Sequence, residues 1–400
     1  MQKKLIALAV AAAFSAPAFA DNANVGFYGA ANLSYDRINS GTATAGTSGN
    51  TSGRISSNTS KFGFKGTDDL GDGLNAVYQV EQVLYMDGGS GNTSTLATRN
   101  TYGGLAGGFG TVLLGRHDTP YKIATRSLDL FGDGIADNRS LMGATGSAYA
   151  AFDGRQPDVL AYISPAISGF TGAIGYVNLN QALNVAENVS TSPKATALSV
   201  AGLFNAGPFF ASLAYETHNL DTAVQAGGNK ESATKFGFGF TQEMFTVGVA
   251  YEKTKDDFGG TSIGGKAAKA PTYDPITGLV TAVGTAATNN ASTFGSDFYG
   301  HSAYYVAGKL NLSSTDAIKL AYTHKGANTG AVNTDAKQIT VGYDHGMSKR
   351  TTLYALYSKL TNGTASNYGL SSNGTSATQA TTSGAGASPS VFSLGMRHTF

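Results

Sequence analysis

The sequence predicts an all-β chain in which about sixteen antiparallel strands form one sheet, closed into a barrel that spans a membrane. Three observations support this prediction. Apolar and polar residues alternate over stretches of five to ten residues, and short and long connections between these stretches alternate in turn. Only 13% of the residues are charged, whereas the chain contains 53 Gly, 20 Tyr and 21 Phe. Soluble domains contain roughly 25% charged residues, and disordered chains contain few aromatic ones.

The first twenty residues have the pattern of a secretory signal peptide. Lys3 and Lys4 form a positively charged end, residues 5–14 form a short apolar segment, and residues 18–20 form a small-residue cleavage site. The apolar segment is too short to cross a membrane as a helix. A buried N-terminal helix is the alternative interpretation. We predict a signal peptide over residues 1–20 and a single barrel domain over residues 21–400.

The composition excludes several classes of protein. Removal of the signal peptide takes 2 of the 27 basic residues and leaves 25 against 26 acidic ones, so the mature chain is nearly neutral. Nucleic-acid binding requires basic residues that neutralise phosphates, and no nucleic acid is expected as a partner. The chain has no Cys and therefore no disulfide framework. No later segment has 18 or more consecutive apolar residues, which excludes a predicted transmembrane helix.

The stretch SKFGFKGTDDLGDGLNAVYQVEQ, residues 60–82, shows the strand pattern. Phe62 and Phe64 lie on one side of the first strand and Lys61 and Lys65 on the other, because successive side chains of a strand point to opposite faces. In a soluble sandwich the apolar face would form the core. In a membrane barrel the apolar face contacts lipid and the polar face lines a lumen.

The same period-two pattern recurs along the chain, which is typical of strands. Further apolar residues share one parity in the stretches 25–35, 236–240, 245–251, 318–322, 339–343 and 392–400. No convincing run has a helical period. We therefore expect a folded state almost free of helix.

The connections between the predicted strands alternate in length. Short connections lie near residues 68–72, 107–109, 165–168, 206–207, 242–244, 312–315 and 346–350. Long connections, rich in Gly, Ser, Thr and Asn, lie near residues 39–52, 87–94, 118–154, 179–192, 219–231, 255–297, 326–333 and 362–389. Outer-membrane barrels have short periplasmic turns and long outer loops, whereas a sandwich gives no reason for this alternation. Because a sixteen-stranded barrel encloses an aqueous channel, we predict that Lys61 and Lys65 line the lumen.

Several stretches taken together resemble the Gram-negative porins, nearest to the neisserial and β-proteobacterial group. They are VGFYGAANLSY, SKFGFKGTDDLGDGLNAVYQVE, TRNTYGGLAGGFGTVLLGRHDTPY, VLAYISPAISGFTGAIGY, VGYDHGMSKRTTLYALYS and LGMRHTF. The resemblance covers essentially the whole chain. It implies a sixteen-stranded barrel in the outer membrane, a homotrimer, and passive diffusion of ions and small hydrophilic solutes. Outer-membrane lipid and lipopolysaccharide are the expected surroundings.

The resemblance also implies a narrow point in the channel. In this family the third outer loop folds inward, and its acidic residues face basic residues on the barrel wall. The corresponding positions are Lys61, Arg116 and Arg155 on the wall and Asp129, Asp133 and Asp137 in the third loop, about 118–154. Strict alternation from Val112 and Leu114 points Arg116 outward, so an inward position requires a bulge or the end of the strand.

The end of the chain carries a second signal. Phe400 is the last residue, and Phe392, Leu394 and Met396 share its parity. This resembles the terminal signature that the outer-membrane insertion machinery reads, so Phe400 is predicted to act in assembly and that machinery is an expected partner.

No cofactor or metal site is predicted. The six His are scattered without an HExxH pattern, no GxSxG motif is present, and GGLAGGFG lacks the Lys-Ser/Thr ending of a phosphate loop.

The leading interpretation is a diffusion channel. The predicted lumen-facing side of the strands carries more basic residues than acidic ones: Lys61, Lys65, Lys235, Lys319 and Lys325, with fewer acids such as Glu81 and Glu252. Because rings of basic side chains favour anions, we expect a weak anion preference. The alternatives are a substrate-selective channel with a binding track, a barrel enzyme and an adhesin.

Overall fold

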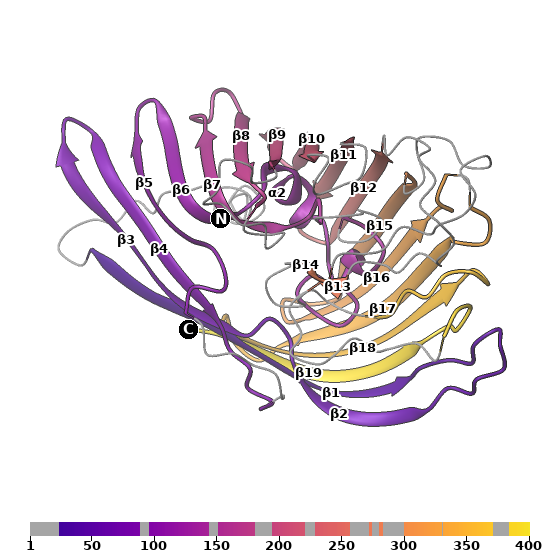
Figure 1. Ribbon diagram of the computed structural model, residues 1–400. Helices are drawn as coiled ribbons and strands as arrows, with labels where there is room; N and C mark the ends of the chain where they lie inside the picture. Colours follow the sequence, from indigo (N-terminus) through magenta and orange to yellow (C-terminus); the bar gives the residue numbers. More distant parts are fainter. Residues whose placement is uncertain are drawn as a thin grey trace.

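The computed structural model describes residues 24–88, 96–143, 151–180, 194–220, 229–256, 272–273, 280–282, 300–329, 331–370 and 384–400. The predicted signal peptide and its cleavage site lie outside these residues and stay a prediction. Nearly all of the described chain consists of strands connected by turns and loops (Figure 1).

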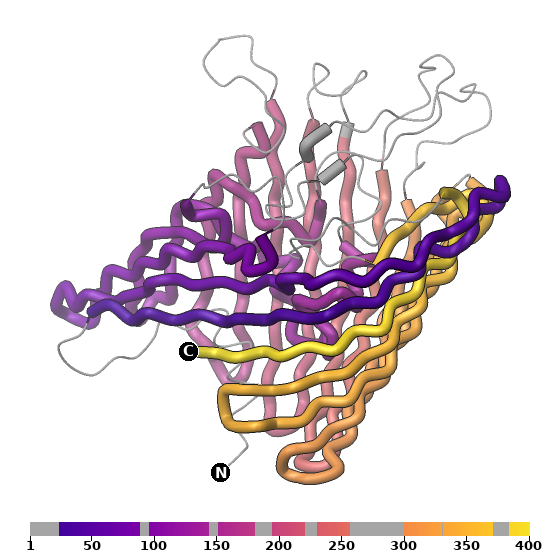
Figure 2. Tube along the Cα trace, turned by 90° about the horizontal axis from the view of Figure 1, so that it is seen from below, coloured from indigo at the N-terminus to yellow at the C-terminus, as the bar shows by residue number. Residues whose placement is uncertain are grey.

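The strands of the main sheet are β1 (Val25–Asn39), β2 (Thr51–Ser57), β3 (Lys61–Gly71), β4 (Leu74–Val83), β5 (Thr101–Gly107), β6 (Gly110–Asp118), β7 (Arg155–Ile163), β8 (Phe170–Asn178), β9 (Ala195–Ala206), β10 (Phe209–Leu220), β11 (Asn229–Thr241), β12 (Phe245–Asp256), β15 (Ser302–Asn311), β16 (Asp316–Lys325), β17 (Ala336–Gly346), β18 (Thr351–Asn362) and β19 (Ser390–Thr399). All neighbouring pairs are antiparallel, and β1 pairs with β19, so the sheet closes on itself. Figure 2 shows the indigo first strands beside the yellow last strand at this seam. Two short strands, β13 (Thr272–Tyr273) and β14 (Val280–Ala282), pair separately.

The barrel has sixteen strand positions although the sheet contains seventeen strands. β1 pairs with β3 over its first residues and with β2 over its last ones, so β2 and β3 occupy one position in succession. They are separated at residues 58–60, where Thr59 has a φ of 54°. The predicted sixteen-stranded antiparallel barrel is therefore confirmed, with one interrupted strand that the sequence pattern did not reveal.

The connections alternate in length as predicted. Tight turns join β3 to β4, β5 to β6, β9 to β10 and β17 to β18, whereas residues 40–50 connect β1 to β2 at the opposite end, where β4 and β6 also end. We call the ends of the barrel the short-turn end and the long-loop end. Because barrels in the outer membrane place long loops outside, we expect the long-loop end to be the external one.

The apolar side chains that alternate along each strand face outward, away from the lumen. Phe27, Leu114 and Leu213 are 56%, 59% and 60% exposed. The opposite parity carries Ala, Gly and polar residues, and Lys61 and Lys65 lie on it. A basic side chain facing lipid near the bilayer midplane would cost roughly 2–4 kcal/mol. The side assignment predicted from residues 60–82 is therefore confirmed.

The connection between β6 and β7, residues 119–154, contains helical turns that the sequence pattern missed. Helix α2 (Pro120–Arg126) begins after Thr119, whose Oγ1 accepts a hydrogen bond from the backbone N–H of Lys122, and η1 (Asn138–Ser140) follows. Seven residues make only two turns, too few for a helical period to be recognised. Among the described residues, no helix is both long and apolar enough to span a membrane.

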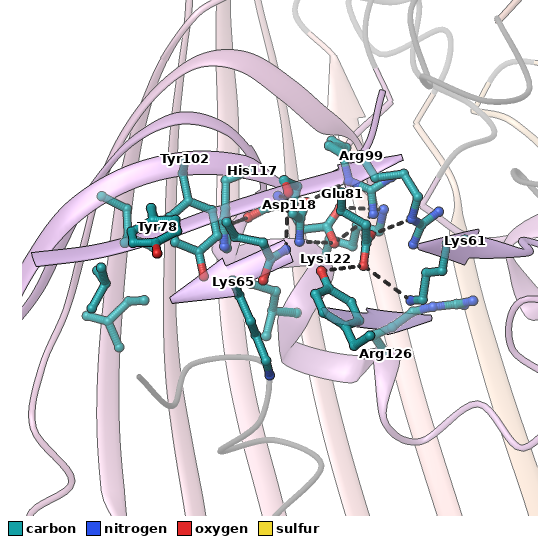
Figure 3. Close-up of a pocket in the computed structure, with 18 of the residues that line it drawn as sticks. Lys61, Lys65, Tyr78, Glu81, Arg99, Tyr102, His117, Asp118, Lys122 and Arg126 are labelled. Atoms are coloured by element: carbon teal, nitrogen blue, oxygen red, sulfur yellow. Dashed lines mark hydrogen bonds and ion pairs between the residues drawn. The ribbon is translucent and has the colours of Figure 1, made fainter. Parts of the chain in front are cut away.

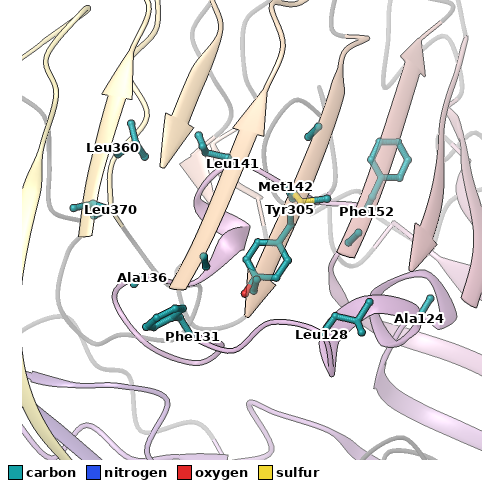
Figure 4. Packing of buried hydrophobic residues seen from close by; sticks show 14 of the residues in the cluster. Ala124, Leu128, Phe131, Ala136, Leu141, Met142, Phe152, Tyr305, Leu360 and Leu370 are labelled. Carbon is teal, nitrogen blue, oxygen red and sulfur yellow. The ribbon is translucent and has the colours of Figure 1, made fainter. Parts of the chain in front are cut away.

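This third loop packs against the inner face of the barrel wall. Its apolar residues Leu128, Phe131 and Leu141 belong to one buried cluster with Tyr305 and Leu360 of the wall (Figure 4). Figure 1 shows α2 on the inner side of β9–β11.

Two inward-facing glycines make room for this packing. A Cβ on Gly239 would lie 2.8 Å from Cδ2 of Leu128, and one on Gly342 would lie 2.7 Å from Cε1 of Phe131. Both separations are too short for carbon atoms that are not bonded. A larger residue at either position would therefore displace the loop.

Candidate functional site: a basic cavity beside the third loop

A cavity of about 340 Å³ lies between the third loop and the wall formed by β1 and β3–β7. Its lining is strongly charged (Figure 3). Among the described residues it includes three acidic side chains, Glu81, Asp118 and Asp133, and seven basic ones, Lys61, Lys65, Arg99, Lys122, Arg126, Arg139 and Arg155. The cavity is therefore positively charged although the whole chain is nearly neutral.

Glu81 on β4 organises one side of the cavity. Its Oε1 lies 2.5 Å from Nε of Arg99, and its Oε2 lies 3.8 Å from Nζ of Lys61 and accepts a hydrogen bond of 3.0 Å from the Tyr28 hydroxyl. The carboxylate is almost fully buried, and so is Arg99, but the Lys61 side chain remains 24% exposed. One carboxylate thus pairs with two basic side chains, and Lys61 remains accessible to a solute in the cavity.

Asp118, the last residue of β6, organises the other side. Its Oδ2 lies 3.1 Å from Nη2 of Arg155, and its Oδ1 lies 2.7 Å from Nζ of Lys122 in α2. Asn100 bridges the pair, since its Oδ1 accepts from Nε of Arg155 at 2.6 Å and its Nδ2 donates to Asp118 at 3.2 Å. Arg155 is thereby held in one orientation at the start of β7.

The three predicted loop aspartates meet at one arginine of their own loop. Arg126, at the end of α2, has Nη2 2.5 Å from Asp137 and 3.0 Å from Asp133, and Nη1 3.5 Å from Asp129. Among these three acids, only Asp133 lines the cavity. Asp129 and Asp137 are enclosed and also accept backbone hydrogen bonds, for example from the N–H of Arg139.

The surroundings of Asp133 and Asp129 shift the pKa values of these two acids in opposite directions. Burial would raise the pKa of Asp133, but Arg126, Lys61 and Arg99 outweigh it and hold the pKa well below its usual range. Burial and the neighbouring Asp137 carboxylate raise the pKa of Asp129 to about 7. Asp133 therefore presents a carboxylate to the cavity at neutral pH, whereas Asp129 keeps its proton to a higher pH than an ordinary aspartate does.

Further contacts hold the third loop against the wall. Lys235 of β11 pairs with Asp153 and lies 3.4 Å from Glu252 of β12. The Glu252 carboxylate accepts hydrogen bonds from the Tyr121 hydroxyl at 2.8 Å and from the backbone N–H of Gly143 at 3.0 Å. These contacts attach both ends of the loop to the same two strands.

Two lysines that were expected to add positive charge to the lumen are enclosed. Lys235 is 1% exposed and Lys325 is 0% exposed. Lys325 donates to Oδ1 of Asn328 and to the carbonyl of Gly326. Lys319 contacts the third loop, with Nζ 3.2 Å from the carbonyl oxygen of Leu130. Parity placed these lysines on the correct face, but neighbouring segments cover or engage them.

Arg116 does not line the cavity, unlike the other two predicted wall residues, Lys61 and Arg155. Its Nε donates to the carbonyl of Thr98 at 3.2 Å, and the residue is not among those that line the cavity. The register between β6 and β7 does shift between Gly115 and His117. The adjacent His117 and Asp118 line the cavity instead, so the proposed contribution of Arg116 to the narrow point gains no geometric support.

Sequence reasoning missed Arg99, Lys122, Arg126 and Arg139. Arg99 lies in a long connection before β5, where a basic residue is ordinarily solvated. Arg126 offered a usable signal, because three aspartates at four-residue intervals follow it closely in the sequence.

Phe400 lies at the seam of the barrel. Its backbone N–H donates to the carbonyl of Gly29 at 3.1 Å, and its carbonyl accepts from the N–H of Gly29 at 3.0 Å. Its ring stacks on Phe27 with centroids 5.6 Å apart. The last residue thus extends the pairing that closes β19 onto β1.

Comparison with known proteins agrees with this architecture. The family model for Gram-negative porins matches residues 7–365. The chain is 28% identical to outer membrane porin protein 32 of Delftia acidovorans over 403 residues, covering 100% of both chains. It is 37% identical to the major outer membrane protein P.IA of Neisseria meningitidis over 124 residues, covering 31% of this chain and 30% of the relative.

Two solved structures share the fold. The anion-selective porin from Comamonas acidovorans has a TM-score of 0.70 and 23% identity, covering 94% of this chain and 99% of the other. A trimer form of the outer membrane protein OmpT of Vibrio cholerae has a TM-score of 0.61 and 15% identity, covering 95% and 100%. With the family match over most of its length, the chain belongs to the Gram-negative porin family and is an outer-membrane channel, not an enzyme.

Proposed function

We propose that the channel prefers anions weakly and that the basic cavity beside the third loop is the narrow point that determines this preference. The proposal rests on the excess of basic over acidic side chains among the described residues of the cavity. A narrow channel with low-dielectric walls concentrates the field of its lining charges, and rings of basic side chains favour anions. At 0.1 M salt the Debye length is about 10 Å, so screening does not remove the effect.

Lys61, Arg99 and Arg155 form the basic wall in this proposal. Asp133 opposes them from the third loop and moderates the preference. Asp129 and Asp137 act indirectly, by holding Arg126 and the loop in place. The structurally similar porin from Comamonas acidovorans is anion-selective, and this supports the same sign of selectivity here.

We further propose that three chains form a homotrimer and that the solutes are ions and small hydrophilic molecules that diffuse passively. The family resemblance and the trimeric Vibrio cholerae structure support this assembly. Outer-membrane lipid and lipopolysaccharide would surround the trimer, and the insertion machinery would recognise the strand that ends at Phe400.

The sign of the reversal potential tests the selectivity. Purified protein inserted into a planar lipid bilayer should give a zero-current potential of anion-selective sign under a tenfold gradient of KCl. A potential of zero or of cation-selective sign would overturn the proposed preference while leaving the channel itself established by its conductance.

A substrate-selective channel is the second candidate, and one observation favours it. Three tyrosines, Tyr28, Tyr78 and Tyr102, line the same cavity, and aromatic side chains along a lumen offer a binding track for a solute with apolar faces. Saturable solute flux in liposomes would support this candidate, whereas flux proportional to solute concentration would support general diffusion.

A further inference from the structure

The basic cavity contains a cation that no acid neutralises. Five of its basic side chains form ion pairs with carboxylates, namely Lys61, Arg99, Lys122, Arg126 and Arg155. Arg139 is buried and donates to the carbonyl of Asp153. Lys65 is half-buried, and within the described part of the chain it forms no ion pair; its Nζ lies 5.3 Å from the centroid of the Tyr28 ring. No dashed line reaches Lys65 in Figure 3. Lys65 therefore keeps its charge available to a solute.

Lys65 belongs to a row of inward side chains that crosses three strands. It pairs with Gln79 of β4, and Gln79 pairs with Tyr102 of β5. Because neighbouring strands lie about 4.8 Å apart, the backbone positions of Lys65 and Tyr102 are about 10 Å apart on the inner face. Nε2 of Gln79 donates to the carbonyl of Asn100 at 3.1 Å. We call Lys65, Gln79 and Tyr102 the mixed row, since it places a cation and an aromatic ring on either side of an amide.

The cavity lining beyond the mixed row, toward the short-turn end, is apolar. Val77, Leu113 and Ile163 line the cavity there and belong to one buried apolar cluster, and Tyr102 packs against that cluster. Gly104 lies between Val77 and Leu113, and a Cβ on it would lie 2.9 Å from Cδ2 of Leu113. The lumen of a barrel channel is ordinarily polar. An apolar patch beside an available cation therefore matches a solute that has both an apolar part and a negative charge.

Tyr102 is the tyrosine best placed to meet such a solute. Its ring lies edge-on to the imidazole of His117, with centroids 5.2 Å apart and an interplanar angle of 66°, and it is half-buried. The ring of Tyr28 differs, because Lys65 lies over it and its hydroxyl donates to Glu81. Aromatic rings prefer offset-stacked or edge-to-face partners. The ring of Tyr102 is thus held by a neighbour while part of it remains accessible to a second ring.

We propose that the mixed row selects aromatic monocarboxylates among the anions that enter the channel. This inference rests on the proposed anion preference and names the class of organic anion that benefits from it. The carboxylate lies against Lys65, and the ring lies against Tyr102 and the apolar patch. A second carboxylate on the ring would face the patch without a cation, and an unpaired charge in apolar surroundings is costly. Binding is weak, because conduction requires that the solute also leaves.

Block of the chloride current measures this selection. Single-channel conductance of the purified protein is recorded in KCl while sodium benzoate is added to both sides of a planar bilayer. Benzoate should reduce the conductance saturably. Acetate carries the charge without the ring, and benzamide carries the ring without the charge. Each should require at least about a tenfold higher concentration for the same block, because a hydrogen bond to a charged group and the contact with a ring each contribute to binding.

Three variants of the mixed row and one control assign the selection to residues. K65Q should raise the half-blocking concentration of benzoate about tenfold, and K65R, which keeps the charge, should be blocked like the parent. Y102L keeps an apolar side chain without the ring and should raise that concentration about fivefold. Lys309 of β15 also has the inward parity and does not line the cavity. K309Q is therefore the matched control and should be blocked like the parent.

Three results would overturn the inference. Equal block by acetate and benzoate would show that the ring contributes nothing, and equal block by cyclohexanecarboxylate would show that aromatic character is not selected. Parent-like block of both K65Q and Y102L would show that the mixed row does not bind the solute. The zero-current potential in a KCl gradient separates this inference from the proposed function. A cation-selective parent contradicts the anion preference, whereas an anion-selective parent that benzoate does not block contradicts only the selection of aromatic carboxylates.

Discussion

Nη2 of Arg126 lies 2.5 Å from Oδ2 of Asp137, so the third loop closes an ion pair within itself. Asp129 and Asp133 meet the same guanidinium. The loop therefore carries its own internal framework, and the acids predicted to face the basic wall act first on the conformation of the loop.

Replacement of Arg126 should loosen this framework. R126Q leaves three carboxylates close together, two of them enclosed, without their cation. Removing one partner of a buried pair typically costs about 3–5 kcal/mol, and because the Arg126 side chain is 22% exposed we expect the lower end of that range. Unfolding in detergent, followed by circular dichroism, measures the loss. K349Q, in an exposed turn, is the control and should be neutral. An unchanged midpoint for R126Q would contradict the role of the pair.

Asp129 should make the stability of the loop depend on pH. Its pKa is raised to about 7 by burial and by Asp137, against an ordinary value of 3.8. Between these values the unfolded chain has released the proton that the folded chain keeps, so stability falls as pH rises through this window. D129N removes this dependence. The unfolding free energy of D129N relative to that of the parent should therefore increase from pH 5 to pH 7, by at most about 3 kcal/mol. A constant difference would show that Asp129 does not titrate there.

Charge reversal in the cavity should change ion selectivity. K61E/R155E converts two wall cations to anions and should shift the zero-current potential in a salt gradient toward cation selectivity, because lining charges dominate the field in a narrow channel. K337E carries the same type of change on the lipid-facing side and is the control, with little expected shift in a bilayer of neutral lipid. If K61E/R155E folds and keeps the parent potential, these residues do not determine selectivity.

Deletion of Phe400 should impair assembly. The deletion removes both backbone hydrogen bonds to Gly29 and the stacking on Phe27, which together extend the closing seam. We expect less heat-modifiable folded protein in outer-membrane fractions. F209A removes a similarly exposed phenylalanine from β10, away from the seam, and should assemble normally. Normal levels of folded protein in the deletion strain would argue against an assembly signal at Phe400.

Cleavage of the predicted signal peptide should leave Asp21 as the first residue. The intact mass of protein purified from outer membranes then corresponds to residues 21–400, and N-terminal sequencing begins at Asp21. The retention of residues 1–20, or a start at another position, would show that the cleavage site at residues 18–20 is wrong.

The sequence by itself determined which residues form strands and which side of each strand meets lipid. Both properties follow from a local rule, since successive side chains of a strand alternate between two faces. Phe62, Phe64, Lys61 and Lys65 obey this rule in a stretch that can be read without knowledge of its partners. The alternation of short and long connections likewise follows from the order of residues, and with it the number of strand positions.

Some site residues could also be predicted, but only in part. Lys61 and Arg155 were expected on the wall and Asp133 on the loop side, and all three line the cavity, while their effect on ions stays a prediction. Arg99 and Glu81 are far apart in sequence order from the third loop, and nothing local indicates that they share one cavity with Asp133. The bulge between Gly115 and His117 shows the same limit, because a single shift in register exchanges the faces of the residues beyond it.

Only the tertiary structure decided which charges remain available to a solute. Parity assigns Lys61 and Lys235 equally to the inside of the barrel, yet Lys61 stays partly exposed while Asp153 and Tyr121 of the third loop enclose Lys235. The path of that loop depends on contacts between distant segments, such as Leu128 against Gly239 and Arg126 against three aspartates. The pattern of a strand defines the direction of a side chain, but its neighbours across the lumen, and therefore its exposure and effective charge, depend on how the whole chain folds.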